Sequence, residues 1–346
     1  MPAAGGFAVR PAFRVALSAD LFSADSQTSW GDIGLDALGS AGVQWDFLPP
    51  DDGTLSADAV AGYDAVLFAA PAVTADTVAG TSTPLLLARF GVGLDAVDVA
   101  ACTAAGVAVT ITPDGARRAV ATAALTLMLA VGHRLLVKHR LVVDGNWAVK
   151  QRYPGTGLTG KTVGTIGFGH VAKELFTLLQ PFATVNLTAS PRARPGDTAA
   201  HGVELVELDD LLRRCDVVVV TAGLNPGSRG LVDAGRLGLM SPHAVLVNVS
   251  RGAIVDTGAL VDALAAGRLG GAGLDVFEEE PLPAGHPLTR LDNVVLSPHA
   301  LAWTDEMAGG NGASAVAAIL AVRDRRVPMH LADPSVLRHP RFGGFG

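Results

Sequence analysis

The sequence contains few cysteines. Only Cys102 and Cys215 occur among its 346 residues, and both lie in apolar surroundings. Two such thiols exclude a disulfide framework and a thiolate metal cage, and they suit a reducing compartment. The histidines show no metal-ligand spacing, so we expect no metal site.

A long apolar run is absent as well. The longest apolar stretch, residues 123–132, runs into His133 and Arg134 and falls short of the roughly 18 residues that a membrane span needs. The first 30 residues lack the basic start and apolar run of a secretory signal. We therefore expect a cytoplasmic protein without a membrane partner.

Basic residues are in the minority. The chain has 26 Lys and Arg against 33 Asp and Glu, a net charge of −7, so it lacks the basic balance that binding to a phosphate backbone usually needs. We expect no nucleic acid partner. What the chain has instead is a hydrophobic content of 49%, enough to bury the cores of two domains.

The first third of the sequence alternates short β-branched runs with helical stretches, which predicts βαβ units and a parallel sheet. The expected strands are residues 13–18, 43–48, 63–70, 84–90 and 107–111. From residue 114 to 147 the apolar positions recur at helical spacing over more than five turns. We expect one long helix there, bridging two domains.

A second βα series begins at Lys161 and predicts a doubly wound sheet. Its seven expected strands are residues 162–167, 184–189, 203–206, 216–222, 244–250, 271–276 and 293–298. Residues 303–327 have helical composition. If this helix packs on the first domain, that domain is discontinuous.

A glycine motif stands at the head of the second series. Gly167, Gly169 and Ala172 form a G-x-G-x-x-A pattern between an apolar strand and a helix start. The first glycine permits a tight turn, the second lets the backbone approach a pyrophosphate, and the small third residue lets helix and strand pack. The pattern predicts a dinucleotide site, with His170 and Val171 at the start of the helix beside the phosphates. A plain strand-turn-helix is the alternative.

The acid expected about twenty residues after this motif is missing. An Asp or Glu there would hold the adenosine ribose, whereas this chain has Ser190 followed by Arg192 and Arg194. A serine does not repel a ribose phosphate, and the two arginines can pair with one. We therefore expect NADP as cofactor, with NAD as the alternative. The competing interpretation is that the loop exposes two of many arginines.

Several motifs in order resemble the D-isomer-specific 2-hydroxyacid dehydrogenase family over nearly the full chain. The matching stretches are residues 89–98, 157–172, 239–256, 271–283 and 293–300. The resemblance implies two doubly wound α/β domains with the active site in the cleft and a homodimer joined through the cofactor domains. A flavodoxin-like substrate domain would comprise residues 1–113 and 304–346, and a Rossmann-type dinucleotide-binding domain residues 114–303.

Arg251, Glu280 and His299 match the family's catalytic residues. Reduction of a 2-keto acid needs a cation for the carboxylate and carbonyl oxygen, a proton donor, and a hydride from the nicotinamide. Arg251 offers a fixed fork of donors, and His299 can give a proton in reduction and take it in oxidation. Glu280 would fix the tautomer of His299 and stabilise its imidazolium form. Taken singly, each residue could also be an ordinary surface or loop residue.

The resemblance also implies further binding residues. The backbone of Gly91, Val92 and Gly93 would hold the substrate carboxylate, where glycine permits close approach. Trp303, which stands where the chain departs from the family pattern, is expected to enclose a bulkier or more apolar substrate, with a hydrophobic anchor between the domains as the alternative. Asp275 would lie near the nicotinamide amide, and the cofactor cleft would also be lined by Gly223, Ser228 and Val249.

The sequence departs from the family pattern at three places. Ala72 stands where relatives often carry a polar or basic residue, Thr122 where glutamate is usual, and Leu301 with Ala302 where a glycine pair is usual. Without the basic residue, phosphoglycerate oxidation is disfavoured. Glu280 disfavours formate oxidation, because the relatives that perform it use an amide there.

The sequence leaves two alternative functions open. Within the class, a dedicated glyoxylate or hydroxypyruvate reductase would suit an NADP-preferring member. From another class, a cofactor-sensing corepressor shares the fold and binds partner peptides. Turnover of a 2-keto acid would discriminate between an enzyme and a sensor.

Overall fold

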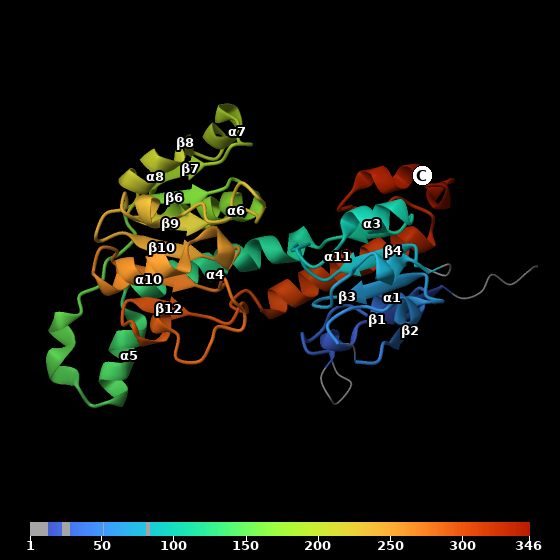
Figure 1. The fold of residues 1–346 in the computed structure, drawn as a ribbon, viewed down its shortest axis with the longest axis horizontal. Coiled ribbons are helices and arrows are strands. Elements are labelled where there is room, and N and C mark those ends of the chain that lie inside the picture. The colour runs from blue at the N-terminus through green and yellow to red at the C-terminus, as the bar shows by residue number, and fades with distance from the viewer. Residues whose placement is uncertain (1–12, 23–27, 51, 81–83) are drawn as a thin grey trace, which may run out of the picture. The chain divides into compact units, whose positions relative to one another are not determined.

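The computed structural model describes residues 13–22, 28–50, 52–80 and 84–346. The chain divides into two compact units. Residues 1–116 and 303–346 make the first unit and residues 117–302 the second. Each unit is built around its own parallel sheet (Figure 1).

The first unit holds a five-stranded parallel sheet in the order β2-β1-β3-β4-β5, which is the flavodoxin-like order. Each strand lies within a stretch predicted from the sequence. The strands are β1 (Arg14–Leu17), β2 (Gln44–Phe47), β3 (Ala65–Phe68), β4 (Leu86–Arg89) and β5 (Ala108–Thr110). All four residues of β3 are buried, because helices cover both faces of a parallel sheet.

Helix α11 (Asp305–Arg323) completes the first unit from the far end of the chain. Thr304 caps it by accepting a hydrogen bond from the Met307 amide at 3.2 Å. Ala308, Ala315 and Ile319 are buried in the same core as the strands of this unit, so the helix predicted over 303–327 packs there. The other helices of the unit are η1 (Ala19–Leu21), α1 (Asp36–Ser40), α2 (Ala57–Val60), η2 (Asp76–Val78), α3 (Val99–Ala104), η7 (Pro334–Arg338) and η8 (Pro340–Phe342).

The second unit holds a seven-stranded parallel sheet in the order β12-β11-β10-β9-β6-β7-β8. All seven predicted stretches contain a strand: β6 (Thr162–Ile166), β7 (Val185–Ala189), β8 (Glu204–Leu205), β9 (Val217–Val220), β10 (Val245–Asn248), β11 (Gly271–Leu274) and β12 (Val294–Leu296). The strand order reverses between β6 and β9, so a Rossmann-type switch point lies at the carboxyl end of β6. The predicted fold class, two doubly wound parallel sheets, is confirmed.

Helices cover this second sheet, and two hydrophobic clusters form the core of the unit. They are α4 (Pro113–Gly132), α5 (Leu135–Val143), η3 (Trp147–Arg152), α6 (His170–Leu179), η4 (Gln180–Phe182), α7 (Pro195–Ala199), α8 (Leu208–Arg214), α9 (Ala234–Leu237), η5 (Gly252–Ile254), α10 (Thr257–Ala265) and η6 (Pro287–Arg290). The first residues of α4 belong to the other unit.

The prediction of a single long helix over residues 114–147 is wrong. The structure has α4 and α5 instead, bent by 59° at a break where Arg134 adopts a left-handed φ of +52°. The cause is a distant segment: the Thr156 amide donates to the Gly132 carbonyl at 2.8 Å, and a Cβ on Gly155 would lie 3.0 Å from the Cα of His133. The segment of Gly155 and Thr156 thus occupies the Gly132 carbonyl and the space beside His133, so a straight helix cannot continue past this point.

Among the described residues, no single helix is long and apolar enough to span a membrane. Only α4 and α5 taken together reach that length and composition, as a bent pair. Both cysteines are buried, and desolvation raises the pKa of Cys102 to about 11 and that of Cys215 to about 12. Neither thiol is therefore poised to react.

Candidate active site

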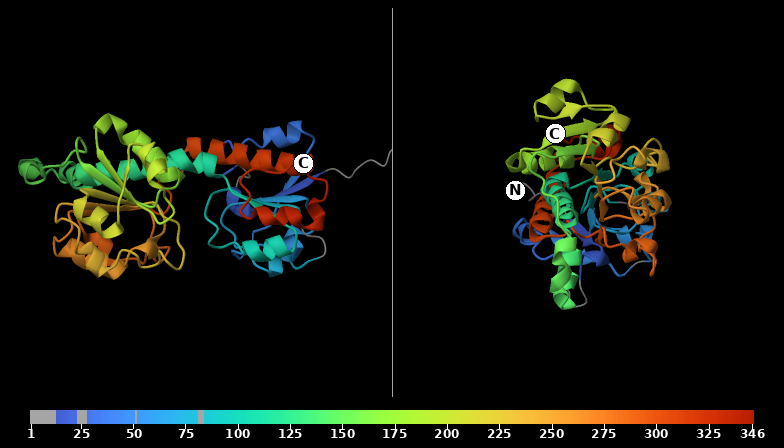
Figure 2. Two further views of the ribbon diagram at one scale, coloured as in Figure 1. Left: turned by 90° about the horizontal axis from the view of Figure 1, so that it is seen from above. Right: turned by 90° about the vertical axis from the view of Figure 1, so that its left-hand side faces the viewer.

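The predicted site residues of the second unit follow the carboxyl ends of neighbouring parallel strands. Gly167 follows β6, Ser190 follows β7, Gly223 follows β9, Val249 and Arg251 follow β10, Asp275 follows β11, and His299 follows β12. These strands run in parallel, so their ends lie along one edge of the sheet (Figure 2). This is the edge at which doubly wound sheets bind ligands.

His299 and Glu280 are in direct contact. The Nδ1 atom of His299 lies 2.8 Å from Oε2 of Glu280, and their side chains are 47% and 37% exposed. The second carboxylate oxygen, Oε1, accepts a hydrogen bond from the Phe277 amide at 2.9 Å. One carboxylate thus holds both its own loop and one nitrogen of the imidazole ring.

The backbone at His299 is held in an unusual conformation. Its φ is +54°, in the left-handed region that residues other than glycine seldom adopt. Asp275 Oδ1 accepts hydrogen bonds from the amides of Ala300 and Leu301, both at 3.1 Å, and the Asp275 side chain is almost fully buried. In this structure Asp275 fixes the loop that carries His299, a role that the sequence did not indicate.

Arg251 lies in a turn organised by a buried asparagine. Asn248 donates to the Arg251 carbonyl at 3.0 Å and accepts from the Ser250 amide at 3.1 Å. The Arg251 guanidinium donates through Nη1 to the Ser250 carbonyl at 2.7 Å. Asn248 was not predicted from the sequence, although a polar residue at the end of an apolar strand is a usable signal.

Gly252 brings the arginine turn against the loop of Glu280. A Cβ on Gly252 would lie 1.8 Å from the carbonyl carbon of Phe277 and 2.2 Å from the amide nitrogen of Glu278. Only glycine permits this approach between two backbones. Arg251 and Glu280 therefore belong to two adjoining segments, and this packing was not anticipated from the sequence.

The glycine motif has the geometry that a pyrophosphate site requires. Gly167 has a φ of +101°, and its missing Cβ would lie 2.9 Å from backbone atoms of Ala222. Open space surrounds the missing Cβ of Gly169, and Ala172 is fully buried between helix and sheet. Helix α6 begins at His170 with no side chain capping its first amides, so these amides can bind an anion. The residues present therefore fit a dinucleotide.

The turn after β7 carries the residues expected at the ribose. Ser190 is half-buried, and its carbonyl accepts a hydrogen bond from the Ala193 amide at 3.2 Å. Arg192 and Arg194 are exposed. Within the described part of the chain, neither guanidinium has an ion-pair or hydrogen-bond partner.

The turn after β9 is fixed by Ser228. Its hydroxyl donates to the Gly223 carbonyl at 2.9 Å and accepts from the Asn225 amide at 2.8 Å. Ser228 is buried, Val249 is half-buried and Gly223 is exposed. Ser228 therefore shapes this turn with its side chain, and no described neighbour crowds the missing Cβ of Gly223.

The predicted carboxylate-binding loop of the first unit follows β4. Gly91 has a φ of +146° and is buried, while the side chain of Val92 is 42% exposed. Arg89 holds the loop from inside by donating to the carbonyls of Phe90 at 3.1 Å and Gly93 at 3.3 Å. The amides of Val92 and Gly93 donate no hydrogen bond to any described residue, so they can serve an anion.

Comparison with known proteins defines the class. A family model for the NAD binding domain of D-isomer specific 2-hydroxyacid dehydrogenases matches residues 125–300. The chain is 36% identical over 267 residues to a glyoxylate reductase of Thermococcus onnurineus, covering 74% of this chain and 79% of the relative. It is 37% identical over 265 residues to D-3-phosphoglycerate dehydrogenase of Mycobacterium tuberculosis, covering 76% of this chain and 49% of the relative.

A solved structure of a Thermus thermophilus protein is similar over most of the chain. It superposes with a TM-score of 0.82 at 30% identity, covering 92% of this chain and all of that one. The chain therefore belongs to the D-isomer specific 2-hydroxyacid dehydrogenase family. The class is an oxidoreductase that carries out NAD(P)-linked hydride transfer on 2-keto or 2-hydroxy acids, which confirms the family and reaction class indicated by the sequence motifs.

Proposed function

We propose that the protein reduces a 2-keto acid with His299 as the proton donor, and that the contact between His299 and Glu280 is the observation that carries this role. An ionised carboxylate only accepts hydrogen bonds, so Nδ1 donates to Glu280 across the 2.8 Å contact. The nitrogen that can give a proton to the substrate is then Nε2.

The charges of the site suit each stage of the reduction. A bound nicotinamide dinucleotide supplies the hydride. The protonated imidazole of His299 is stabilised by the Glu280 carboxylate before its Nε2 proton passes to the carbonyl oxygen. Arg251 offers several donors in a planar fork, which suits the carboxylate and carbonyl oxygen of the substrate. In the oxidative direction Nε2 takes the proton back.

The cofactor we propose is NADP, bound by residues 114–303, with residues 1–113 and 304–346 binding the substrate. Gly167, Gly169 and the first amides of α6 would hold the pyrophosphate. The ribose phosphate would pair with the exposed guanidinium groups of Arg192 and Arg194. A carboxylate at Ser190 would repel that phosphate, and this chain has none there.

Dissociation constants for both cofactors test this assignment. The double variant Arg192→Ala with Arg194→Ala should weaken NADPH binding by at least about ten- to a hundredfold, since the loss of one charged contact alone costs about 1.5 to 3 kcal/mol. NADH binding should stay nearly unchanged, because NADH lacks the phosphate. Arg268→Ala, which removes an exposed arginine elsewhere in the unit, serves as the control. A wild type that binds NADH as tightly as NADPH would rule out the assignment.

We also propose that the protein is a homodimer joined through the second unit. Helix α5 and η3 form an arm at the edge of this unit (Figure 1). Five large apolar side chains are exposed on it: Leu135, Leu136, Val142, Val143 and Trp147. Several exposed large apolar side chains on one arm mark an interaction surface.

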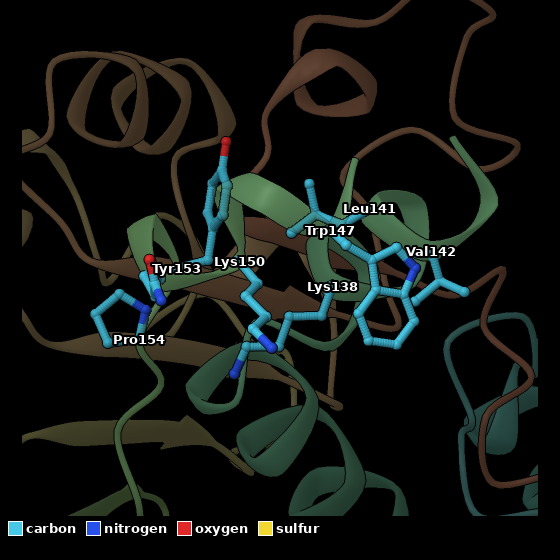
Figure 3. A pocket seen from close by; sticks show the side chains of 8 residues that line it. Lys138, Leu141, Val142, Trp147, Lys150, Tyr153 and Pro154 are labelled. Atoms are coloured by element: carbon cyan, nitrogen blue, oxygen red, sulfur yellow. The ribbon is translucent and has the colours of Figure 1, made fainter. Parts of the chain in front are cut away.

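The arm also carries an open pocket that a partner could fill. It has a volume of about 490 Å³, and Figure 3 shows Lys138 and Lys150 between Tyr153 and Trp147 among the residues that line it. A second copy of the chain is the occupant we propose, because a twofold interface lets the same apolar patch of both copies cover each other.

A further inference from the structure

Three aromatic side chains of the first unit form a continuous row beside the loop of Gly91. The ring of Phe90 lies 5.2 Å from that of Trp30, measured between centroids, and the ring of Trp30 lies 4.2 Å from that of Trp303. The row begins at the residue next to Gly91 in the chain. It joins residues from both ends of the sequence in one cluster.

Exposure increases along this row. Phe90 is buried, Trp30 is half-buried, and Trp303 is 57% exposed. The two inner rings support the outer indole, which leaves much of its surface open to solvent. An indole held from behind in this way offers a large, rigid apolar surface that a planar group can cover at little cost in side-chain entropy.

We propose that Trp30 and Trp303 form a specificity surface for the side chain of the substrate, and that the preferred substrates are 2-keto acids with an aromatic side chain. This inference rests on the proposed reduction of a 2-keto acid. The amides of Val92 and Gly93 bind the carboxylate, and the substituent at C3 lies against the indole of Trp303.

Trp303 is close to the proposed proton donor in the chain, which it follows by four residues. Phe90, at the other end of the row, is bonded directly to Gly91 of the carboxylate loop.

Two apolar segments of the first unit favour an apolar substituent, and Arg89, the cation next to the Gly91 loop, already donates to the carbonyls of Phe90 and Gly93. Ala72, in the loop after β3, takes part in backbone pairing: its amide donates to Gly53 at 2.8 Å and its carbonyl accepts from Leu55 at 2.9 Å. Residues 69–75, which form this loop, include no charged side chain. Val92, exposed beside Gly91, adds further apolar surface.

The test is a ratio of specificity constants for phenylpyruvate and glyoxylate, the latter having no side chain to contact the indole. We expect the wild-type kcat/KM for phenylpyruvate to exceed that for glyoxylate at least tenfold. Trp303→Ala and Trp30→Ala should each lower this ratio about tenfold or more, mainly through KM for phenylpyruvate. The conservative variants Trp303→Phe and Trp30→Phe should restore most of it.

Internal controls separate the possible outcomes. Glyoxylate reduction by the tryptophan variants reports whether they still fold. Met329→Ala removes an apolar side chain of the same unit that is 73% exposed, and it should leave the ratio unchanged. If glyoxylate is reduced normally and neither alanine variant changes the ratio, the specificity surface is refuted while the proposed function stands. If the wild type reduces none of glyoxylate, pyruvate and phenylpyruvate, the proposed function itself fails, and this inference with it.

Discussion

Glu280 determines what His299 can do. Its carboxylate touches Nδ1 at 2.8 Å and the Phe277 amide at 2.9 Å, so it sets both the tautomer of the imidazole and the position of its own loop. The neighbouring Glu278 and Glu279 are also exposed acids, but no such contact to the imidazole is found for them. Because only Glu280 of these three adjacent glutamates contacts the imidazole, a substitution of Glu279 is a matched control for the same substitution of Glu280.

Glu280→Gln should shift the pH dependence of reduction. Glutamine keeps an acceptor for Nδ1 but loses the negative charge that stabilises the imidazolium. The proton donor is then depleted sooner, so the alkaline limb of the kcat/KM profile should move to lower pH. The matched change Glu279→Gln should leave the profile unchanged. Superposable profiles for wild type and Glu280→Gln would contradict the role of this carboxylate.

At the scale of single residues, the sequence motifs single out Arg251, Glu280 and His299, whose catalytic roles stay predictions. Arg251 and His299 follow strands β10 and β12, as the motifs indicate. Trp30 was overlooked because its importance comes from a ring contact with Trp303, which no local pattern reveals. The position of Asp275 beside the nicotinamide stays a prediction, and the structure adds that its carboxylate holds the loop of His299.

Between the elements, the site depends on the packing of two loops. The turn after β10 lies against the loop after β11, and Gly252 is the point of contact. This arrangement sets the segments of Arg251 and Glu280 beside each other. A side chain at position 252 would have to push one of these loops away.

Gly252→Ala should therefore reduce both stability and activity. The added Cβ would lie 1.8 Å from the Phe277 carbonyl carbon, and overpacking of this kind costs about 1 to 3 kcal/mol. The free energy of unfolding, from denaturant titration, and kcat/KM should fall together. Gly258→Ala is the control, because its Cβ would meet nothing closer than 3.5 Å. Equal stability and activity in the two variants would show that the close approach is unimportant.

The strands were predictable from local sequence, whereas the break between α4 and α5 was not, because it depends on a distant segment. Strands such as β9, with four consecutive buried valines, carry their signal locally. The break between α4 and α5 depends on Thr156 and Gly155, which lie more than twenty residues further along the chain and pack against Gly132 and His133. Helical periodicity continues across the break, so the sequence alone indicated one helix.

At the scale of the whole molecule, the exposed apolar arm predicts self-association. The double variant Val143→Asp with Trp147→Asp places two charges on the patch and should shift the protein from dimer to monomer in sedimentation equilibrium. Met329→Asp, at an exposed apolar position of the other unit, should not. A wild type that is monomeric at micromolar concentration would refute the homodimer.

The central claim is that a family member with this site reduces 2-keto acids by proton donation from His299. The most direct measurement is the rate of NADPH and NADH oxidation with a panel of 2-keto acids, for wild type and His299→Ala. We predict turnover by the wild type and a loss of about 10²- to 10⁴-fold in kcat for the variant, with cofactor dissociation constants nearly unchanged. Equal turnover by both proteins would remove His299 from the mechanism and contradict the account.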